Sequence, residues 1–244
     1  DSFFLKTRPV ADHQWGEQLL QGVFVLCDGM GGCDQGEVAS AMATFRLTQD
    51  LLLHETPEFT ADISLKSSLY KVNQDIHQEN IRLRQLGLGK MGTTAVVAVL
   101  QERQMSVGHV GDSRCYCLTE SKGLEQLTTD HERGQARIAQ GVPESEAYAS
   151  PEAFYLTQAL GPMPNHRIVP DVSQIHLDED SLFLLCSDGL SDYQVLESHG
   201  ESCLAPFLDS RKDLGEAAQM LLDIGLQHNG HDNITMILVR ICLP

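Results

Sequence analysis

The sequence predicts an α+β fold in which sheets and helices lie in layers. Short, strongly apolar segments occur in clusters, and segments with helical spacing of apolar residues come in pairs between these clusters. A strict alternation of strand and helix is missing, so a layered sandwich built on antiparallel strands is favoured over a doubly wound parallel sheet. No repeat, low-complexity tract or linker divides the 244 residues, and we expect one domain over residues 1–244.

The N-terminal third supplies the first strands and two long helices. Strands are expected at residues 3–5 and 23–27, joined by a polar connection. Apolar residues recur at helical spacing over residues 37–54 and again over residues 62–87. These two segments are predicted to form a pair of helices.

The middle of the chain returns to strands. Apolar runs predict strands at residues 94–100, 105–110 and 115–118. A short helix is expected over residues 130–141. The looser stretch that follows, residues 142–154, is rich in Glu, Ala, Ser and Pro and is the best candidate for a mobile surface flap.

The C-terminal part begins with the most apolar strand of this half, residues 181–186. Asp213 and Glu216 have the spacing of a capping box, which predicts the start of a helix. A last strand is expected over residues 234–241.

Composition excludes several classes of function. The chain has 34 acidic and 17 basic residues and a formal net charge of -17, which argues against nucleic acid or an anionic membrane as the main partner. No signal peptide and no run of 18 apolar residues occurs. The seven cysteines are an odd number without a Cys-x-x-Cys pair, so a reducing, cytoplasmic compartment fits better than a disulfide framework.

One device occurs repeatedly where apolar strands begin or end: an aspartate. It is present at Asp28-Gly29, Asp112, Asp188-Gly189 and Asp232-Asn233. If these strands share a sheet, the carboxylates can converge on one rim, where they repel strongly unless they are protonated or bridged by metal. Oxygen ligands without a Cys-His cluster select Mg²⁺, Mn²⁺ or Ca²⁺ over zinc. Two such ions can activate a water for attack on phosphorus.

Each aspartate taken singly also fits a turn or a helix cap. Gly111-Asp112-Ser113-Arg114 in particular would form a turn in which Arg114 pairs locally. The order of the whole set favours the metal interpretation for Asp28, Asp188 and Asp232.

Other catalytic patterns are missing. None of the seven cysteines is followed by arginine in a Cys-x₅-Arg motif, and Gly89-Lys90 lacks the upstream glycine of a phosphate-binding loop because position 84 is arginine. His131-Glu132 does not extend to a zinc-protease motif, since position 135 is glutamine, and no Gly-x-Ser-x-Gly elbow occurs. Metal-assisted phosphoryl hydrolysis is the chemistry that remains.

With these motifs in order, the chain resembles the metal-dependent serine/threonine protein phosphatases of type 2C, in their bacterial form. The matching segments span nearly the whole chain in the order of the family. They are Asp1-Ser2-Phe3, residues 25–32, residues 91–95, residues 107–114, residues 127–131, residues 156–161, residues 185–190 and residues 230–235.

The resemblance implies a four-layer α-β-β-α sandwich of two mainly antiparallel sheets flanked by helices. It also implies hydrolysis of phosphoserine and phosphothreonine in proteins by a water or hydroxide that bridges two divalent metals, without a phosphoenzyme intermediate. The ions would be Mg²⁺ or Mn²⁺. The substrates would be phosphorylated targets of serine/threonine kinases, and the chain is expected to be a monomeric domain within a longer protein.

The resemblance also assigns the ligands. Asp28 would bridge both metals and the Gly29 carbonyl would bind one of them. Asp188 and Asp232 would hold the other, and Asp112 with Asp188 would form a weaker third site. Asp1 would hold a metal-bound water through a hydrogen bond, while Asn233 orients the Asp232 loop.

The chain departs from the family pattern in two respects. Met30 stands where eukaryotic members carry a histidine that acts as general acid, so protonation of the leaving group would come from water. The first strand of the family, with its phosphate-binding arginine, would precede Asp1 and is expected upstream of the sequence given. Two other functions stay open: a catalytically silent, phosphatase-like regulatory module, and a hydrolase of small phosphoesters that uses the same site.

Overall fold

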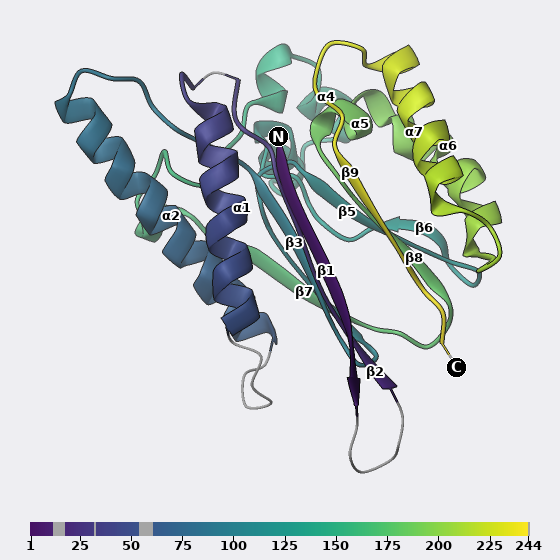
Figure 1. Cartoon of the computed structure of the whole chain (residues 1–244). Coiled ribbons are helices and arrows are strands. Elements are labelled where there is room, and N and C mark those ends of the chain that lie inside the picture. Colours follow the sequence, from purple (N-terminus) through teal and green to yellow (C-terminus); the bar gives the residue numbers. More distant parts are fainter. Residues whose placement is uncertain (12–17, 32, 54–60, 244) are drawn as a thin grey trace.

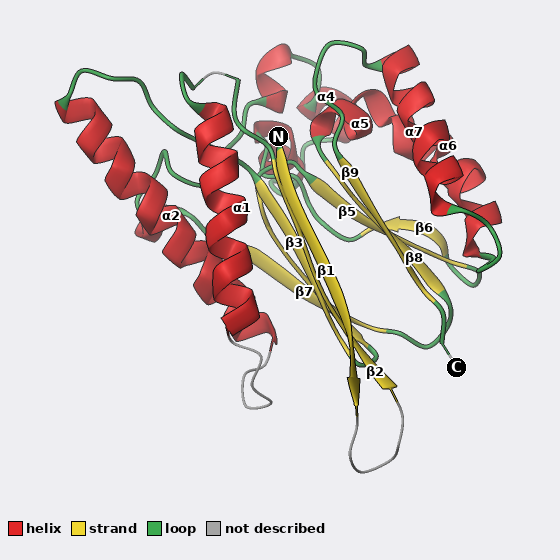
Figure 2. Cartoon of the chain, viewed as in Figure 1, coloured by secondary structure: helices red, strands yellow, loops and turns green. Residues whose placement is uncertain are grey.

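A computed structural model describes residues 1–11, 18–31, 33–53 and 61–243. Two antiparallel sheets lie face to face in the middle of the molecule, and helices cover the outer face of each sheet (Figures 1 and 2). The predicted α+β class and the four-layer α-β-β-α sandwich are therefore confirmed.

The first sheet has five strands, and every neighbouring pair in it is antiparallel. Its strands, in spatial order, are β1 (Ser2–Ala11), β2 (Gln18–Cys27), β3 (Ala95–Gln101), β4 (Gln104–Val110) and β7 (Asp171–His176). The helices α1 (Gly36–Leu53) and α2 (Ala61–Gln85) pack on its outer face (Figure 1).

The second sheet has four strands, again all antiparallel. Its order is β6 (Gly123–Gln126), β5 (Arg114–Thr119), β8 (Ser181–Cys186) and β9 (Met236–Ile241). The helices α6 (Val195–Leu204) and α7 (Leu214–His228) cover it. The shorter helices α3 (Arg133–Ile138), α4 (Glu144–Ala147) and α5 (Asp188–Ser191) lie in the connections at one end of the sandwich.

Alternation along the strands explains the layers. In β8, Phe183 and Leu185 point into the core between the two sheets, whereas Leu182 and Leu184 point to the core under α6 and α7. Side chains on alternate positions of a strand face opposite ways, so a strand that is apolar throughout must be buried on both faces. The strand predicted at residues 181–186 is confirmed on these grounds.

Several predicted bounds need correction. The first strand continues to Ala11 instead of ending at residue 5, because β1 pairs along its whole length with β2. The helix expected over residues 130–141 is shorter, and β6, β7 and α6 were not predicted at all. Of the motif at residues 25–32, Gly32 lies outside the described residues.

The predicted start of α7 is confirmed in part. Asp213 is the N-cap, and its carboxylate accepts a hydrogen bond from the Gly215 N–H at 2.9 Å. The Glu216 backbone N–H donates to the Asp213 carbonyl at 3.2 Å, and no reciprocal bond from the Glu216 carboxylate is found. Among the described residues, no helix is both long and apolar enough to cross a membrane.

Candidate active site

The aspartates predicted from strand ends meet in one cleft. This cleft has a volume of about 760 Å³ and lies where the ends of both sheets meet. Its walls include every residue predicted as a ligand: Asp1, Asp28, Gly29, Asp112, Asp188 and Asp232. The structure therefore brings the whole predicted set together, although its members are up to 231 positions apart in the sequence.

The backbone around Asp28 is fixed by the segment that leads into β3. The Asp28 carbonyl accepts from the Thr93 hydroxyl at 2.7 Å and from the Thr94 N–H at 2.8 Å. The Asp28 N–H donates to the Thr94 hydroxyl at 3.1 Å, and that hydroxyl also bonds Ser113 Oγ at 2.6 Å. Both threonine hydroxyls thus position the carboxylate at the end of β2 through its backbone.

The two Asp-Gly pairs need glycine for close approach of backbones. A Cβ at Gly29 would lie 2.3 Å from the carbonyl oxygen of Gly36, where α1 begins. A Cβ at Gly189 would lie 2.1 Å from the Asn233 carbonyl oxygen. Since real Cβ atoms do not come so close, glycine allows the Asp28 turn to contact α1 and the Asp188 turn to contact the Asp232 loop.

Asn229 holds the Asp188 turn from the other side. Its side-chain amide donates to the carbonyls of Asp188 at 3.3 Å and Gly189 at 3.2 Å. The Thr235 N–H donates to Ser187 Oγ at 3.0 Å. Sequence reasoning missed Asn229, whose one signal is that it directly precedes the motif at residues 230–235.

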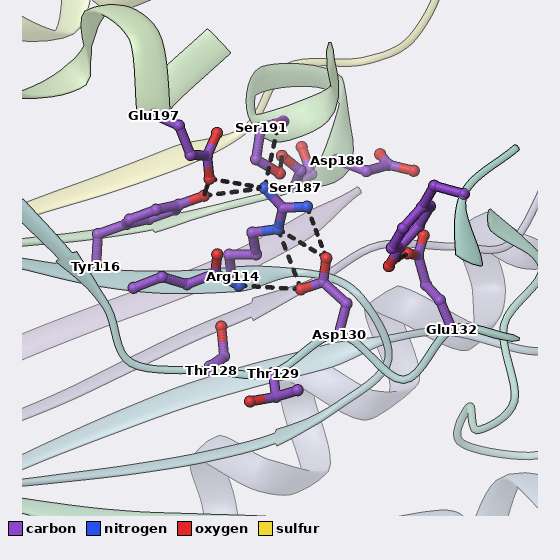
Figure 3. Close-up of polar contacts among 12 residues, drawn as sticks. Arg114, Tyr116, Thr128, Thr129, Asp130, Glu132, Ser187, Asp188, Ser191 and Glu197 are labelled. Carbon is purple, nitrogen blue, oxygen red and sulfur yellow. Dashed lines mark hydrogen bonds and ion pairs between the residues drawn. The ribbon is translucent and has the colours of Figure 1, made fainter. Parts of the chain in front are cut away.

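Arg114 ties three segments together next to the cleft, where it lines a second cavity with Asp130 (Figure 3). Its guanidinium makes a bidentate ion pair with Asp130, 2.6 Å between Nη2 and Oδ2, and Nη1 donates to the Ser191 carbonyl at 3.1 Å. It also contacts Glu197 at 3.2 Å. The alternative in which Arg114 pairs within its own turn does not hold, because Asp130, Ser191 and Glu197 supply the acceptors.

The carboxylates of the cleft repel one another. Burial, followed by the charges of Asp188 and Asp232, raises the pKa of Asp28. Burial also raises the pKa of Asp188, and it raises the pKa of Asp112 well above its usual range, with Asp188 as the next cause. Burial is thus the main cause of these shifts, and the neighbouring carboxylates add to it.

One oxygen of this group has no partner. Asp188 Oδ1 is buried, and no hydrogen-bond donor reaches it in the described part of the chain. A buried carboxylate oxygen without a donor is costly unless a cation neutralises it. Carboxylate and carbonyl oxygens are the donor set of Mg²⁺ and Mn²⁺, so the residues present fit such ions.

The cleft aspartates are more widely spaced than a closed metal site requires. Among the described residues, three ligand atoms within 4.8 Å of one another occur at His109, His131 and Asp171. The cleft aspartates form no group of that tightness. Asp232 is solvent-exposed, and its Oδ1 accepts from the Asn233 N–H at 2.7 Å.

Three ring nitrogens of the two histidines in this group have hydrogen-bond partners. The Gly111 N–H donates to His131 Nδ1 at 3.1 Å, so Nε2 carries the proton and donates to Asp171 Oδ2 at 3.1 Å. His109 stacks on the same ring at 4.7 Å and donates through Nε2 to the Thr129 carbonyl at 2.8 Å. The His131 side chain is buried, and through Gly111 it supports the turn that carries Asp112.

The segment predicted as a flap contains two short helical turns, α4 and Pro151–Phe154. Arg137 of α3 donates to the carbonyls of Glu146 and Ala147 at 2.9 Å each. The Tyr148 hydroxyl donates to Glu132 at 2.7 Å. The segment is therefore packed on α3 rather than loose, and its mobility stays a prediction.

Further residues line the cleft that no sequence motif had indicated, among them Glu37, Arg133, Phe154 and Tyr155. None of these four had a partner at a characteristic spacing in the sequence. Only the folded chain brings them to the walls.

Comparisons with known proteins find phosphatases among the similar chains. The Listeria monocytogenes (serotype 4b, strain F2365) protein named serine/threonine phosphatase stp is 33% identical over 223 residues, which cover 90% of this chain and 84% of the relative. The Mycobacterium tuberculosis (strain CDC 1551 / Oshkosh) protein named PstP is 27% identical over 228 residues, 90% of this chain and 40% of the relative.

Solved structures have the same fold. The structure of serine/threonine phosphatase Stp1 from Staphylococcus aureus matches with a TM-score of 0.77 and 26% identity, over 99% of this chain and 96% of that one. The catalytic domain of PstP in complex with two manganese ions matches with a TM-score of 0.68 and 24% identity, over 98% of this chain and 96% of that one.

The family assignment rests on most of the chain. The sequence model of the family described as Protein phosphatase 2C matches residues 12–223. This chain belongs to the protein phosphatase 2C family.

Proposed function

We propose that this chain hydrolyses phosphoserine and phosphothreonine in proteins. The observation that carries the proposal is the convergence of Asp28, Asp112, Asp188 and Asp232 in one cleft, with a buried Asp188 oxygen that lacks a donor. The relatives named serine/threonine phosphatases support the substrate class.

Two divalent ions, Mg²⁺ or Mn²⁺, are proposed for the cleft. Asp28, the Gly29 carbonyl, Asp188 and Asp232 would hold them, and Asp112 with Asp188 would hold a weaker third ion. The related structure with two manganese ions supports this number. Bound ions of this kind supply a Lewis acid for a phosphoryl oxygen and lower the pKa of water enough for it to attack phosphorus.

Residues of the chain itself orient the proposed metal ligands. Thr93 and Thr94 hold the Asp28 backbone, and Asn229 holds the carbonyl of Asp188. Met30 lines the cleft and carries no proton, so the leaving group takes its proton from water. Asp1 lies in the same cleft, and we propose that it accepts a hydrogen bond from a water there.

We propose direct attack by water, without a phosphoenzyme; the thiol in the cleft is a poor candidate for a competing nucleophile. Cys33 is the one thiol among the described residues that line the cleft, and burial raises its pKa. A protonated thiol is a poor nucleophile. We propose that no covalent intermediate forms on this chain.

A cytoplasmic location is proposed from the state of the cysteines. All seven cysteines are free, as a reducing cytoplasm requires. We further propose that the chain acts as a single, monomeric domain on phosphoproteins produced by serine/threonine kinases.

The test is phosphate release. With Mn²⁺, the protein should hydrolyse a phosphothreonine peptide and p-nitrophenyl phosphate, and EDTA or Asp188→Asn should lower the rate by about 10³-fold or more. Asp178→Asn is the matched control, because Asp178 is an exposed aspartate outside the cleft. Absence of manganese-dependent release by the wild-type chain would contradict the proposal. Turnover of the small ester alone would identify a small-phosphoester hydrolase.

A further inference from the structure

The cleft contains one basic side chain among the described residues that line it, Arg133. Six acidic residues line the same cleft: Asp1, Glu37, Asp28, Asp112, Asp188 and Asp232. A phosphorylated substrate is itself anionic, so the walls repel it wherever cations do not intervene. A lone arginine in such a place therefore needs an explanation.

Arg133 is held by residues 155 and 156, which directly follow the flap. Its backbone N–H donates to the Tyr155 carbonyl at 3.1 Å, and Glu132 forms an isolated antiparallel bridge with Leu156. The guanidinium carbon lies 5.1 Å from the centre of the Tyr155 ring. Both the backbone and the side chain of Arg133 are thus placed relative to residues 155 and 156.

The Arg133 guanidinium donates no hydrogen bond to the described residues, and Glu152 acts on it through charge alone. Among the described residues, no carboxylate forms an ion pair with Arg133. Arg137, one turn further along α3, differs, since its guanidinium donates to two flap carbonyls and pairs with Glu146. Arg137 is therefore a structural residue of the flap, whereas Arg133 has unused N–H groups at the cleft.

A guanidinium stacked on an aromatic ring is pre-organised. Stacking fixes the plane of the group, and the N–H edge of that plane matches two oxygens of a phosphate or a carboxylate. Tyr155 and Phe154 are 54% and 52% exposed, so they offer an apolar surface beside the arginine. Anion recognition and contact with the neighbouring part of a peptide are thus combined on one rim.

We infer that Arg133, stacked on Tyr155, binds the anionic group of the phosphorylated substrate and sets substrate affinity. The inference rests on the proposed function and adds a binding residue to it. The anionic group is either the phosphoryl group itself or a carboxylate beside the phosphorylated residue, and both have the oxygen geometry that a guanidinium recognises.

The experiment compares steady-state kinetics of Arg133→Ala with the wild type, using manganese-loaded enzyme. Three substrates are used: p-nitrophenyl phosphate, a phosphothreonine peptide with neutral flanks and one with acidic flanks. Inorganic phosphate is tested as a competitive inhibitor. KM should rise about tenfold or more for the substrates that Arg133 contacts, with kcat within about twofold, because a charge-assisted hydrogen bond is lost.

Companion variants separate binding from folding. Arg133→Lys keeps the charge without the planar fork and should recover part of the affinity. Tyr155→Phe should behave like the wild type, and Tyr155→Ala should raise KM because it removes the stacking surface. Arg103→Ala removes the same charge from an exposed turn between β3 and β4, outside the cleft, and should leave KM unchanged.

The kinetic results identify the group that Arg133 binds or overturn the inference. A higher KM for all three substrates together with weaker inhibition by phosphate identifies the phosphoryl group as the partner, and a change confined to the acidic peptide identifies the flanking carboxylates. Unchanged KM for Arg133→Ala on an active enzyme overturns the inference and leaves the proposed function standing. If the wild-type chain shows no turnover, the proposed function fails. Fluorescence anisotropy then measures how tightly the wild type and Arg133→Ala bind the same phosphopeptides. Equal affinity of the two proteins overturns the inference.

Discussion

Asp28 and Asp188 place negative charge where burial penalises it. Because burial and the neighbouring carboxylates raise the pKa of Asp28 in the folded chain, the folded state binds its proton more tightly than the unfolded state does. An unfolded aspartate loses its proton near pH 3.9. The stability contributed by this group is therefore full below about pH 4 and is lost as the pH rises through the folded pKa.

The first prediction follows for the metal-free protein. In EDTA at pH 8, Asp28→Asn should unfold at a higher temperature than the wild type by about 2–8 °C, because the amide removes a buried, repelled charge worth about 1–2 kcal/mol. At pH 4 the difference should vanish. Thermal unfolding followed by circular dichroism measures both, and a lower melting temperature of the variant at pH 8 would contradict the argument.

Single residues differ in how far the sequence revealed them. Asp28, Asp188 and Asp232 were found because each lies near one end of an apolar strand, and these strand ends lie close together in the fold. Arg133 and Asn229 were not found, because a lone polar residue has no periodicity. The partners of Arg114 could not be read from the sequence, since its contacts with Asp130 and Ser191 depend on how β5 and α5 pack.

At the scale of elements, α5 depends on the strand beside it. Arg114 of β5 is 17% exposed and its partner Asp130 is 3% exposed, and the same guanidinium bonds the last carbonyl of α5. Asp188 begins this helix. The ion pair between Arg114 and Asp130 therefore helps to place α5, and with it the proposed metal ligand Asp188.

A second prediction concerns that pair. Arg114→Met should lower the free energy of unfolding by about 3–5 kcal/mol, because it leaves a buried carboxylate unpaired. Urea unfolding measures the change. Arg114→Met combined with Asp130→Leu should recover a large part of it, and a double variant as unstable as the sum of the single variants would show that the pair is not coupled.

The junction between β2 and β3 gives a third prediction. Thr94→Val removes the hydroxyl that bonds the Asp28 N–H and Ser113, so stability should fall by about 1–3 kcal/mol and kcat by about tenfold. Thr48→Val is the matched control. The Thr48 hydroxyl is buried without a hydrogen-bond partner, and its removal should cost nothing measurable. Equal effects of the two variants would contradict a special role for Thr94.

Over the whole molecule, buried elements were predictable and exposed ones were not. The strands β3, β4 and β8 are almost wholly buried, so their apolar runs stood out. The edge strands β6 and β7 are mainly exposed and carry polar residues, and nothing in the sequence distinguished them from loops. Their place is set by pairing with β5 and β4, which is a long-range property.

A fourth prediction links metal, protons and fold. Because burial and like charges raise the pKa of Asp28, Asp112 and Asp188, binding of Mn²⁺ should release about one proton or more at pH 7. Calorimetry in two buffers of different ionisation enthalpy measures this number. Binding should also weaken as the pH falls, and a heat independent of the buffer would contradict the prediction.

The cleft aspartates are proposed to hold divalent ions, and anomalous X-ray scattering at the manganese edge, from crystals of this chain soaked in Mn²⁺, tests this proposal. We expect two peaks in the cleft, with Asp28 in contact with both and Asp188 and Asp232 in contact with one. A cleft without peaks, or a peak confined to His109, His131 and Asp171, would contradict it.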